Sequence, residues 1–200
     1  FFGPNEVYAA RKITSALYSS DNGDSYENRF IGAAPATQVD FVSDQEAFFV
    51  SIMRQLYRTT DQAETWTAIA DFAEGSRVMD FINDQIGFVY NGSGILLKTV
   101  DGGQNWVEVA QHSNFNFSII ALEAISETLI EVFAGRRFYR STDGGQTFEQ
   151  VIDINPLNST TNEVRPQALY RDGDTYLLAG GGTSVVYTND NFVTVTDQLF

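Results

Sequence analysis

The stretch TVDGGQNW at residues 99–106 decides the fold, because related eight-residue windows occur five times along the 200-residue chain. Their aspartates are 40, 40, 42 and 47 residues apart. Strand-like sequence flanks each window, and one unit of this length cannot bury both of its faces alone. The repeat therefore predicts a β-propeller or a related β array. The windows begin at Ser19 (SSDNGDSY), Thr59 (TTDQAETW), Thr99 (TVDGGQNW), Ser141 (STDGGQTF) and Thr188 (TNDNFVTV).

Each position of the window has a physical reason to recur. An aspartate at a tight turn accepts backbone N–H hydrogen bonds, and a glycine two residues later adopts positive φ without steric cost. The hydroxyl or amide side chain that follows caps the turn, and the aromatic residue leads into the next strand and packs between sheets. The second window has Ala63 in place of the glycine, and the fifth has Phe192 and Val195. We expect a structural role for Asp21, Asp61, Asp101, Asp143, Asp190, Trp66, Trp106 and Phe148.

The window resembles the Asp-box, or BNR repeat, of sialidase-type propellers and of the photosystem II assembly and stability factor family. The third unit gives the best match, since GFVYNGSGILLKT at residues 87–99 leads into Asp101 and Trp106. The resemblance implies an all-β chain, a β-propeller of four-stranded blades. In such a blade the box is a turn on the outside, between the third and fourth strands. The activity stays open, because one fold carries many functions.

Aligned on the windows, the units divide into blades over residues 1–32, 33–73, 74–115, 116–156 and 161–200. Short alternating apolar stretches between Gly, Asn and Asp turns predict β-hairpins, and no segment has sustained helical periodicity. In the first unit only Phe1 and Phe2 precede the sequence that aligns with a second strand. We expect residues 1–200 to form a single propeller domain or fragment, an arc of a larger propeller, with the first blade lacking its inner strand.

The composition limits the classes of partner. The chain has 26 acidic residues against 12 Lys and Arg, a formal net charge of −14, and no cysteine. This charge argues against a nucleic-acid surface, which needs clustered basic residues. No window is long and apolar enough for a transmembrane helix, so we expect no direct membrane insertion.

Two sets of acidic residues recur with the repeat. The set on the predicted inner strands, which line the channel of a propeller, is Asp40, Asp80 and Glu123. Three carboxylates there would make an acidic channel mouth that binds a cation or a basic group. A recurring acid also has a simple structural explanation, and that alternative stays open. The set at the following turns, where aspartate is favoured locally, is Asp44, Asp84, Glu127 and Asp174.

No catalytic constellation stands out, and we expect no catalytic residue, metal site or cofactor. His112 is the only histidine, which excludes a multi-histidine zinc site. The arginines include no equivalent of the motif that precedes the first box in sialidases, and Tyr8, Tyr90 and Tyr170 are explained as strand residues. A glycosidase needs two carboxylates at a defined separation, which a single sequence does not reveal.

We therefore expect a non-enzymatic binding or scaffold module of a secreted or cell-surface protein, which engages a protein or glycan partner and further blades or domains of the same polypeptide. The expected location is extracytoplasmic: secreted, cell-surface or periplasmic. A role in photosystem assembly is disfavoured, because the resemblance covers a repeat rather than a whole protein. The alternative is part of an Asp-box glycoside hydrolase, sialidase-like or xyloglucanase-like.

Overall fold

The chain folds into antiparallel sheets whose strands are consecutive in the sequence. The computed structural model describes residues 7–10, 15–19, 21, 23–30, 36–115, 119–154, 165–181, 184–194 and 196–199. Contacts divide the chain into two compact units, Phe1–Ser113 and Asn114–Phe200. The expectation that residues 1–200 form a single domain stays a prediction.

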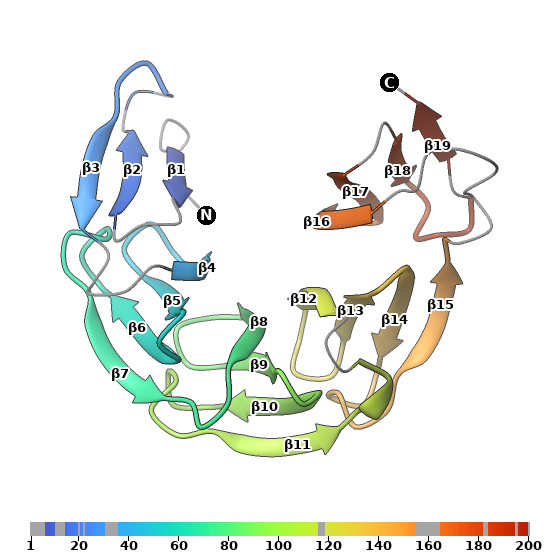
Figure 1. Ribbon diagram of the computed structural model, residues 1–200, viewed down its shortest axis with the longest axis horizontal. Helices are drawn as coiled ribbons and strands as arrows, with labels where there is room; N and C mark the ends of the chain where they lie inside the picture. Colours follow the sequence, from blue (N-terminus) through green and yellow to red (C-terminus); the bar gives the residue numbers. More distant parts are fainter. Residues whose placement is uncertain are drawn as a thin grey trace. The chain divides into compact units, whose positions relative to one another are not determined.

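The first unit contains three sheets, named blades 1 to 3 (Figure 1). Blade 1 consists of β1 (Val7–Ala10), β2 (Ser15–Ser19) and β3 (Glu27–Phe30). Blade 2 consists of β4 (Ala36–Phe41), β5 (Ala47–Ser51), β6 (Gln55–Thr59) and β7 (Thr67–Asp71). Blade 3 consists of β8 (Ser76–Phe81), β9 (Gly87–Asn91), β10 (Ile95–Thr99) and β11 (Val107–Gln111). The inner strand of blade 1, sought at Phe1 and Phe2, lies outside the described residues.

The second unit contains blades 4 and 5, and the short 3-10 helix η1 (Ser113–Phe115) precedes them in the chain. Blade 4 consists of β12 (Ile119–Ala124), β13 (Ile130–Ala134), β14 (Arg137–Ser141) and β15 (Glu149–Asp153). Blade 5 consists of β16 (Arg165–Asp172), β17 (Thr175–Gly181), β18 (Ser184–Thr188) and β19 (Thr196–Leu199). The predicted all-β class and four-stranded blades are confirmed in blades 2 to 5.

A β-bulge recurs at the same place in the inner strand of each four-stranded blade. The register shifts between Ala36 and Gln38 in blade 2, and between Ser76 and Val78 in blade 3. The corresponding shifts in the second unit fall at residues 119–121 and 166–168. A bulge bends its strand and increases the local twist. Because the bulges coincide, residues of different blades can be compared position by position.

The core of blades 2, 3 and 4 lies at the second strand. Every residue of β5 (AFFVS), β9 (GFVYN) and β13 (IEVFA) is buried, whereas the outermost strands β7 and β11 are largely exposed at their first two residues. A strand buried on both faces reads as a continuous apolar run, which explains why the alternation of polar and apolar residues is lost there. Neighbouring blades therefore stabilise one another through these strands.

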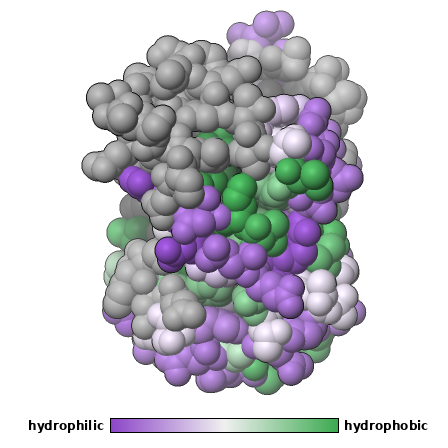
Figure 2. Space-filling model, turned by 90° about the vertical axis from the view of Figure 1, so that its right-hand side faces the viewer, coloured by the Kyte–Doolittle hydropathy of each residue, from purple (hydrophilic) through white to green (hydrophobic). Residues whose placement is uncertain are grey.

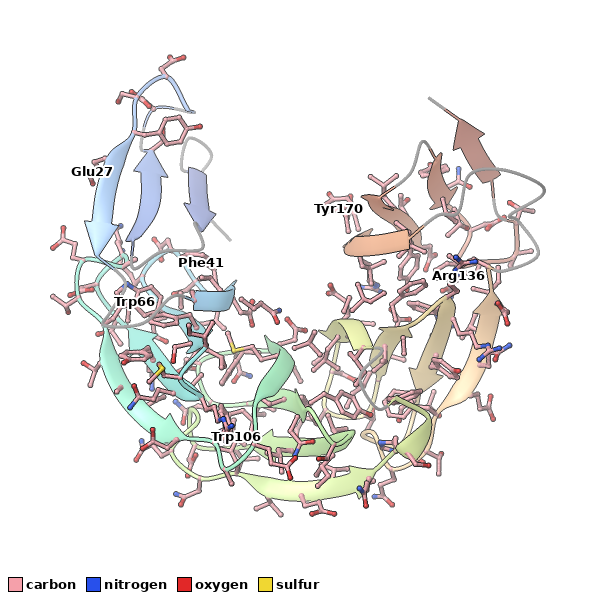
Figure 3. The ribbon with its side chains drawn as sticks, in the orientation of Figure 1. Glu27, Phe41, Trp66, Trp106, Arg136 and Tyr170 are labelled. Atoms are coloured by element: carbon pink, nitrogen blue, oxygen red, sulfur yellow. The ribbon has the colours of Figure 1, made fainter. Side chains whose placement is uncertain are left out.

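Aromatic side chains hold blades 2 and 3 together in the first unit. Phe48 of β5 and Phe81 of β8 stack with ring centroids 3.7 Å apart and planes 2° from parallel. Trp106, which ends the third aspartate window, packs edge-on against Phe72 at 5.4 Å and against Phe81 at 6.0 Å (Figure 3). Gly87 is required here, because an added Cβ would lie 2.5 Å from the Phe81 ring.

In the second unit the corresponding core uses a different aromatic cluster. Phe138 of β14 lies 4.4 Å from Phe192 and 5.3 Å from Tyr176, measured between ring centroids. Phe192 takes the place that glycine holds in the third and fourth windows and keeps a positive φ of 68°. This left-handed backbone is costly for an aromatic residue. Burial of the ring against Phe138 and Tyr176 offsets that cost.

We expect Gly103→Ala to destabilise the protein by about 1–3 kcal/mol, because Gly103 has a φ of +87° and its Cβ would lie 2.6 Å from Leu56 Cδ2. Urea unfolding of the full chain measures the free energy of unfolding. Gly75→Ala is the matched control, since no atom lies within 4 Å of its added Cβ. Equal destabilisation by both substitutions would contradict this account of Gly103.

Candidate binding site

The five aspartate turns, which are the windows quoted above, each form the same pattern of hydrogen bonds. In the third turn the Thr99 hydroxyl donates to Asp101 Oδ1 at 2.8 Å and accepts the Gly103 amide at 2.9 Å. Asp101 Oδ1 also accepts the Asn105 amide at 2.9 Å, and Oδ2 accepts its side-chain amide at 2.7 Å. Each carboxylate is thus occupied within its own turn. Equivalent bonds surround Asp21, Asp61, Asp143 and Asp190.

Hydrogen bonds to the turn aspartates favour their ionised form. The Ser19 hydroxyl is the largest cause that lowers the pKa of Asp21 to about 2, and the Thr147 hydroxyl is the largest cause that lowers the pKa of Asp143 to about 2. The pKa of Asp101 is lowered as well, chiefly by the Asn105 amide. Because these pKa values lie below the ordinary 3.8, the ionised aspartates stabilise the folded protein above about pH 4. This contribution to stability is lost as pH falls toward 2.

Side chains of β4 join the inner strands of blades 2 and 3. The Gln38 side chain accepts the Met79 amide at 2.9 Å and donates to the Met79 carbonyl oxygen at 2.6 Å. Two residues further on, Asp40 Oδ2 accepts the Phe81 amide at 2.6 Å. Side chains of β4 therefore satisfy backbone groups on the facing edge of β8, as a neighbouring strand would. The two blades are fixed to each other at their inner edge.

The carboxyl group of Asp40 is surrounded by protein atoms, although part of the residue reaches solvent. Burial raises the pKa of Asp40 to about 6, against the opposing effect of the Phe81 amide. Asp80, on the neighbouring inner strand, forms a side-chain hydrogen bond with Asp40. The folded protein therefore favours protonated Asp40, and ionisation of this group near neutral pH costs stability.

The structure places the three predicted channel-mouth acids on inner strands, and it brings two of them together. Asp40 on β4 and Asp80 on β8 are neighbours in the first unit. Glu123 on β12 belongs to the second unit, where its negative charge attracts the positive charge of Arg171 on β16. At the matching position of blade 5, β16 carries Tyr170, whose side chain is exposed (Figure 3).

A buried charge network in the second unit was missed by the sequence reasoning. Glu131 of β13 is 1% exposed, and three side chains bind its carboxylate. Arg140 Nη2 lies 2.7 Å from Oε1, Arg171 Nε lies 3.5 Å from Oε2, and the Tyr176 hydroxyl donates to Oε2 at 2.8 Å. Arg171 Nε also donates to the Tyr176 hydroxyl at 3.0 Å. The network ties blade 4 to blade 5.

Comparison between blades shows which signal could have revealed this network. Glu131 in blade 4 occupies the position that Phe48 has in blade 2. Glu131 pairs with Arg140 and Phe48 pairs with Arg58, and each arginine directly precedes an aspartate turn. Arg171 likewise occupies the position of Phe81. An ion pair between blades 4 and 5 thus replaces the aromatic stack between blades 2 and 3. The available signal was a charged residue at a repeat position that is aromatic in blades 2 and 3.

Other candidates for chemistry have structural partners. His112 Nδ1 lies 2.9 Å from the hydroxyl of the buried Tyr90, and Arg137 Nε donates to Asp153 Oδ2 at 2.8 Å.

Within the described ranges, no group of three or more His, Cys, Asp or Glu residues is placed to hold a metal ion. No helix of the described part of the chain is long and apolar enough to span a membrane. Hydrophilic residues predominate on the described part of the face in Figure 2.

Blades that repeat in register and pair through their inner strands define a β-propeller, and solved structures agree. The chain is similar to YCF48 bound to D1 peptide, with a TM-score of 0.68 and 15% identity over 100% of this chain and 66% of that chain. YCF48 from Cyanidioschyzon merolae matches with a TM-score of 0.65 and 15% identity, over 100% and 70%. An ancestral GH74 enzyme matches with a TM-score of 0.62 and 15% identity, over 97% and 29%.

The chain thus spans about two thirds of the two YCF48 chains and less than a third of the GH74 chain. This agrees with the expected arc of a larger propeller. No sequence among curated proteins matches the chain.

Residues 33–167 match the family model of the photosynthesis system II assembly factor YCF48. The match covers more than half of the chain, so the chain belongs to this family. The resemblance to photosystem II assembly factor repeats is therefore confirmed.

The expected secreted, cell-surface or periplasmic location is wrong, because the family is named for assembly of a photosynthetic system. That expectation relied on the resemblance of single repeats to surface and secreted proteins, whereas the family match extends over most of the chain. The repeated turn is needed for the folding of each blade, and it does not indicate in which cellular compartment the protein is located.

We expect Asp40→Asn to raise stability above pH 6. Since the folded-state pKa of about 6 exceeds the ordinary 3.8, the stability contributed by protonated Asp40 is full below pH 4 and is lost as pH rises through 6. Asparagine keeps an oxygen that accepts the Phe81 amide and removes the ionisation, so the variant should gain about 3 kcal/mol at pH 8. Urea unfolding at pH 4, 6 and 8 measures this difference. Asp44→Asn, at an exposed turn, is the control.

We expect Glu131→Gln to cost about 3–5 kcal/mol of unfolding free energy, because it leaves Arg140 and Arg171 without their buried counter-charge. Thermal and urea unfolding of the full chain measure the loss. Glu149→Gln, on the exposed start of β15, removes the same charge without breaking a buried pair. A loss below 1 kcal/mol for Glu131→Gln would show that the network contributes little.

Proposed function

We propose that the chain is a non-enzymatic binding module of the YCF48 family that holds a polypeptide segment along its inner strands. One observation carries the proposal: the YCF48 structure that the chain resembles along its whole length is bound to a D1 peptide. The family description as an assembly factor supports a protein partner. A glycan partner, and further blades or domains of the same polypeptide, stay predictions from the sequence.

The carboxylates of the chain support binding rather than chemistry. Asp101 and its counterparts are occupied in the aspartate turns, and Glu131 is buried against two arginines. Asp40 accepts the Phe81 amide at 2.6 Å and hydrogen-bonds to Asp80, so both carboxyl groups already have protein partners. A glycosidase needs its two carboxylates about 5 Å or more apart on opposite sides of the scissile bond.

Charge indicates which polypeptides the inner strands favour. The chain carries a formal net charge of −14, and Asp80 and Glu123 add negative charge on β8 and β12. A segment with basic or neutral groups is attracted by this field, whereas an acidic segment is repelled. Because salt screens exposed charges over a Debye length of about 8 Å at physiological ionic strength, binding of a basic segment should weaken as salt rises.

The test is calorimetric titration of the full chain with a synthetic D1 peptide. We expect saturable binding of this peptide and none of a scrambled peptide of equal composition. Asp80→Asn and Glu123→Gln should weaken binding several-fold if the inner strands form the site, whereas Glu149→Gln on β15 should leave it unchanged. Equal binding of the D1 and scrambled peptides would overturn the proposal.

The glycoside hydrolase alternative is tested on the same protein. Similarity to the GH74 enzyme at 15% identity shows the fold alone. Incubation with xyloglucan and with sialosides should release no sugar. Release of sugar that Asp80→Asn or Glu123→Gln abolishes, with stability unchanged, would replace the binding proposal by the hydrolase.

A further inference from the structure

The outer strand of blade 3 has an open edge. β11 is the last strand in the order β11-β10-β9-β8, and among the described strands it pairs with β10 alone. Backbone N–H and C=O groups on the free side of an edge strand are available to another extended chain. Such strand addition is a common mode of peptide recognition, in which side-chain pockets beside the edge provide specificity.

An apolar hollow lies on one face of the same sheet, across β10, the turn that follows it and β11. Val100 is 65% exposed and Val107 is 70% exposed, and the two side chains lie in the same hollow. With Val109 they form the apolar part of a hollow of about 170 Å³. Its rim carries Lys98, Asp101 and Asn105.

Equivalent positions in other blades show that this hollow belongs to the repeat but that its apolar lining does not. In blade 4 the same positions line a hollow of about 200 Å³, where Thr142 and Glu149 stand in place of Val100 and Val107. Blade 2 has Thr60 and Thr67 there, and both are exposed although blade 3 packs on that blade. Residues at these positions therefore stay exposed even when a neighbouring blade packs on the sheet. Among blades 2 to 4, only blade 3 has valine at both positions.

The sequence of β11 indicates what would bind there. Val107 and Val109 line the hollow, and Glu108 between them is exposed without lining it. In a strand added along β11, successive side chains point to opposite faces. Residues beside the two valines would be aliphatic, and residues beside Glu108 would be basic, because opposite charges across strands stabilise pairing.

We propose that the free edge of β11 is a second polypeptide site, separate from the inner strands, which accepts an extended segment of alternating aliphatic and basic residues. The added strand pairs with the backbone of β11. Its aliphatic side chains cover Val100 and Val107, and its basic side chains pair with Glu108.

The probe is a synthetic hexapeptide of alternating valine and lysine, titrated into the full chain by fluorescence anisotropy and followed by amide hydrogen exchange. We expect protection of the β11 amides and at least tenfold weaker binding of a peptide of alternating valine and glutamate. A peptide of alternating serine and lysine tests whether charge alone suffices, and equally tight binding of that peptide would overturn the proposal.

The matched variant is Val100→Thr with Val107→Thr, which copies the residues of blade 2 and so should fold. We expect it to bind the valine–lysine peptide at least tenfold more weakly. Thr60→Val with Thr67→Val should leave protection of β11 unchanged. Unchanged affinity in the first variant, or protection elsewhere than β11, would overturn the proposal, as would a dimer through β11 that excludes the peptide in sedimentation measurements.

Titration of the same variants with the D1 peptide separates this site from the inner strands. Val100→Thr with Val107→Thr should retain D1 binding, because the proposed inner-strand site is elsewhere. If the D1 peptide binds and the valine–lysine peptide does not, the β11 site is overturned and the proposed function stands. If the valine–lysine peptide alone binds, the β11 site stands and the inner-strand proposal fails.

Discussion

Burial of the second strand from both faces, seen in blades 2 to 4, is the constraint on which the structure depends. All residues of β5, β9 and β13 are buried, and a single sheet covers neither of its own faces. Each blade must therefore pack against another, and the inner bulges and the aspartate turns recur because every blade meets the same requirement. In the third turn the Asp101 carboxylate is bonded within the turn, and the Gly102 amide donates to the Gln85 carbonyl oxygen outside it. These polar groups are thereby satisfied beside an apolar interface.

The same contact between blades is made with different chemistry in the two units. Phe48 stacks on Phe81 between blades 2 and 3, whereas Glu131 binds Arg171 between blades 4 and 5. An aromatic stack needs shape complementarity alone, but a buried ion pair also needs every polar atom to find a partner. Tyr176 and Arg140 satisfy the remaining lone pairs of Glu131. Substitution in the ion network should consequently be tolerated less well than conservative repacking of the aromatic stack.

Most of the acidic residues that suggest chemistry in the sequence serve the fold in the structure. The turn aspartates are satisfied locally, and Asp40 joins two inner strands. Surfaces outside these contacts are the better places for function, and the chain offers two of different character. The inner strands are acidic and repeat from blade to blade, whereas the edge of β11 is apolar and belongs to blade 3.

The sequence by itself determined the all-β class, the period of the blades and the aspartate turns, because local hydrogen bonding and strand periodicity act over a few residues. It also identified Asp40, Asp80 and Glu123 as inner-strand residues, since the period places them there. Only the tertiary structure decided that Asp40 binds the Phe81 amide, that Glu131 meets Arg171, and that Val100 and Val107 share one hollow. The pairs Asp40–Phe81 and Glu131–Arg171 join residues about 40 apart in the chain, across blades. Such contacts depend on how blades pack, which local periodicity does not encode.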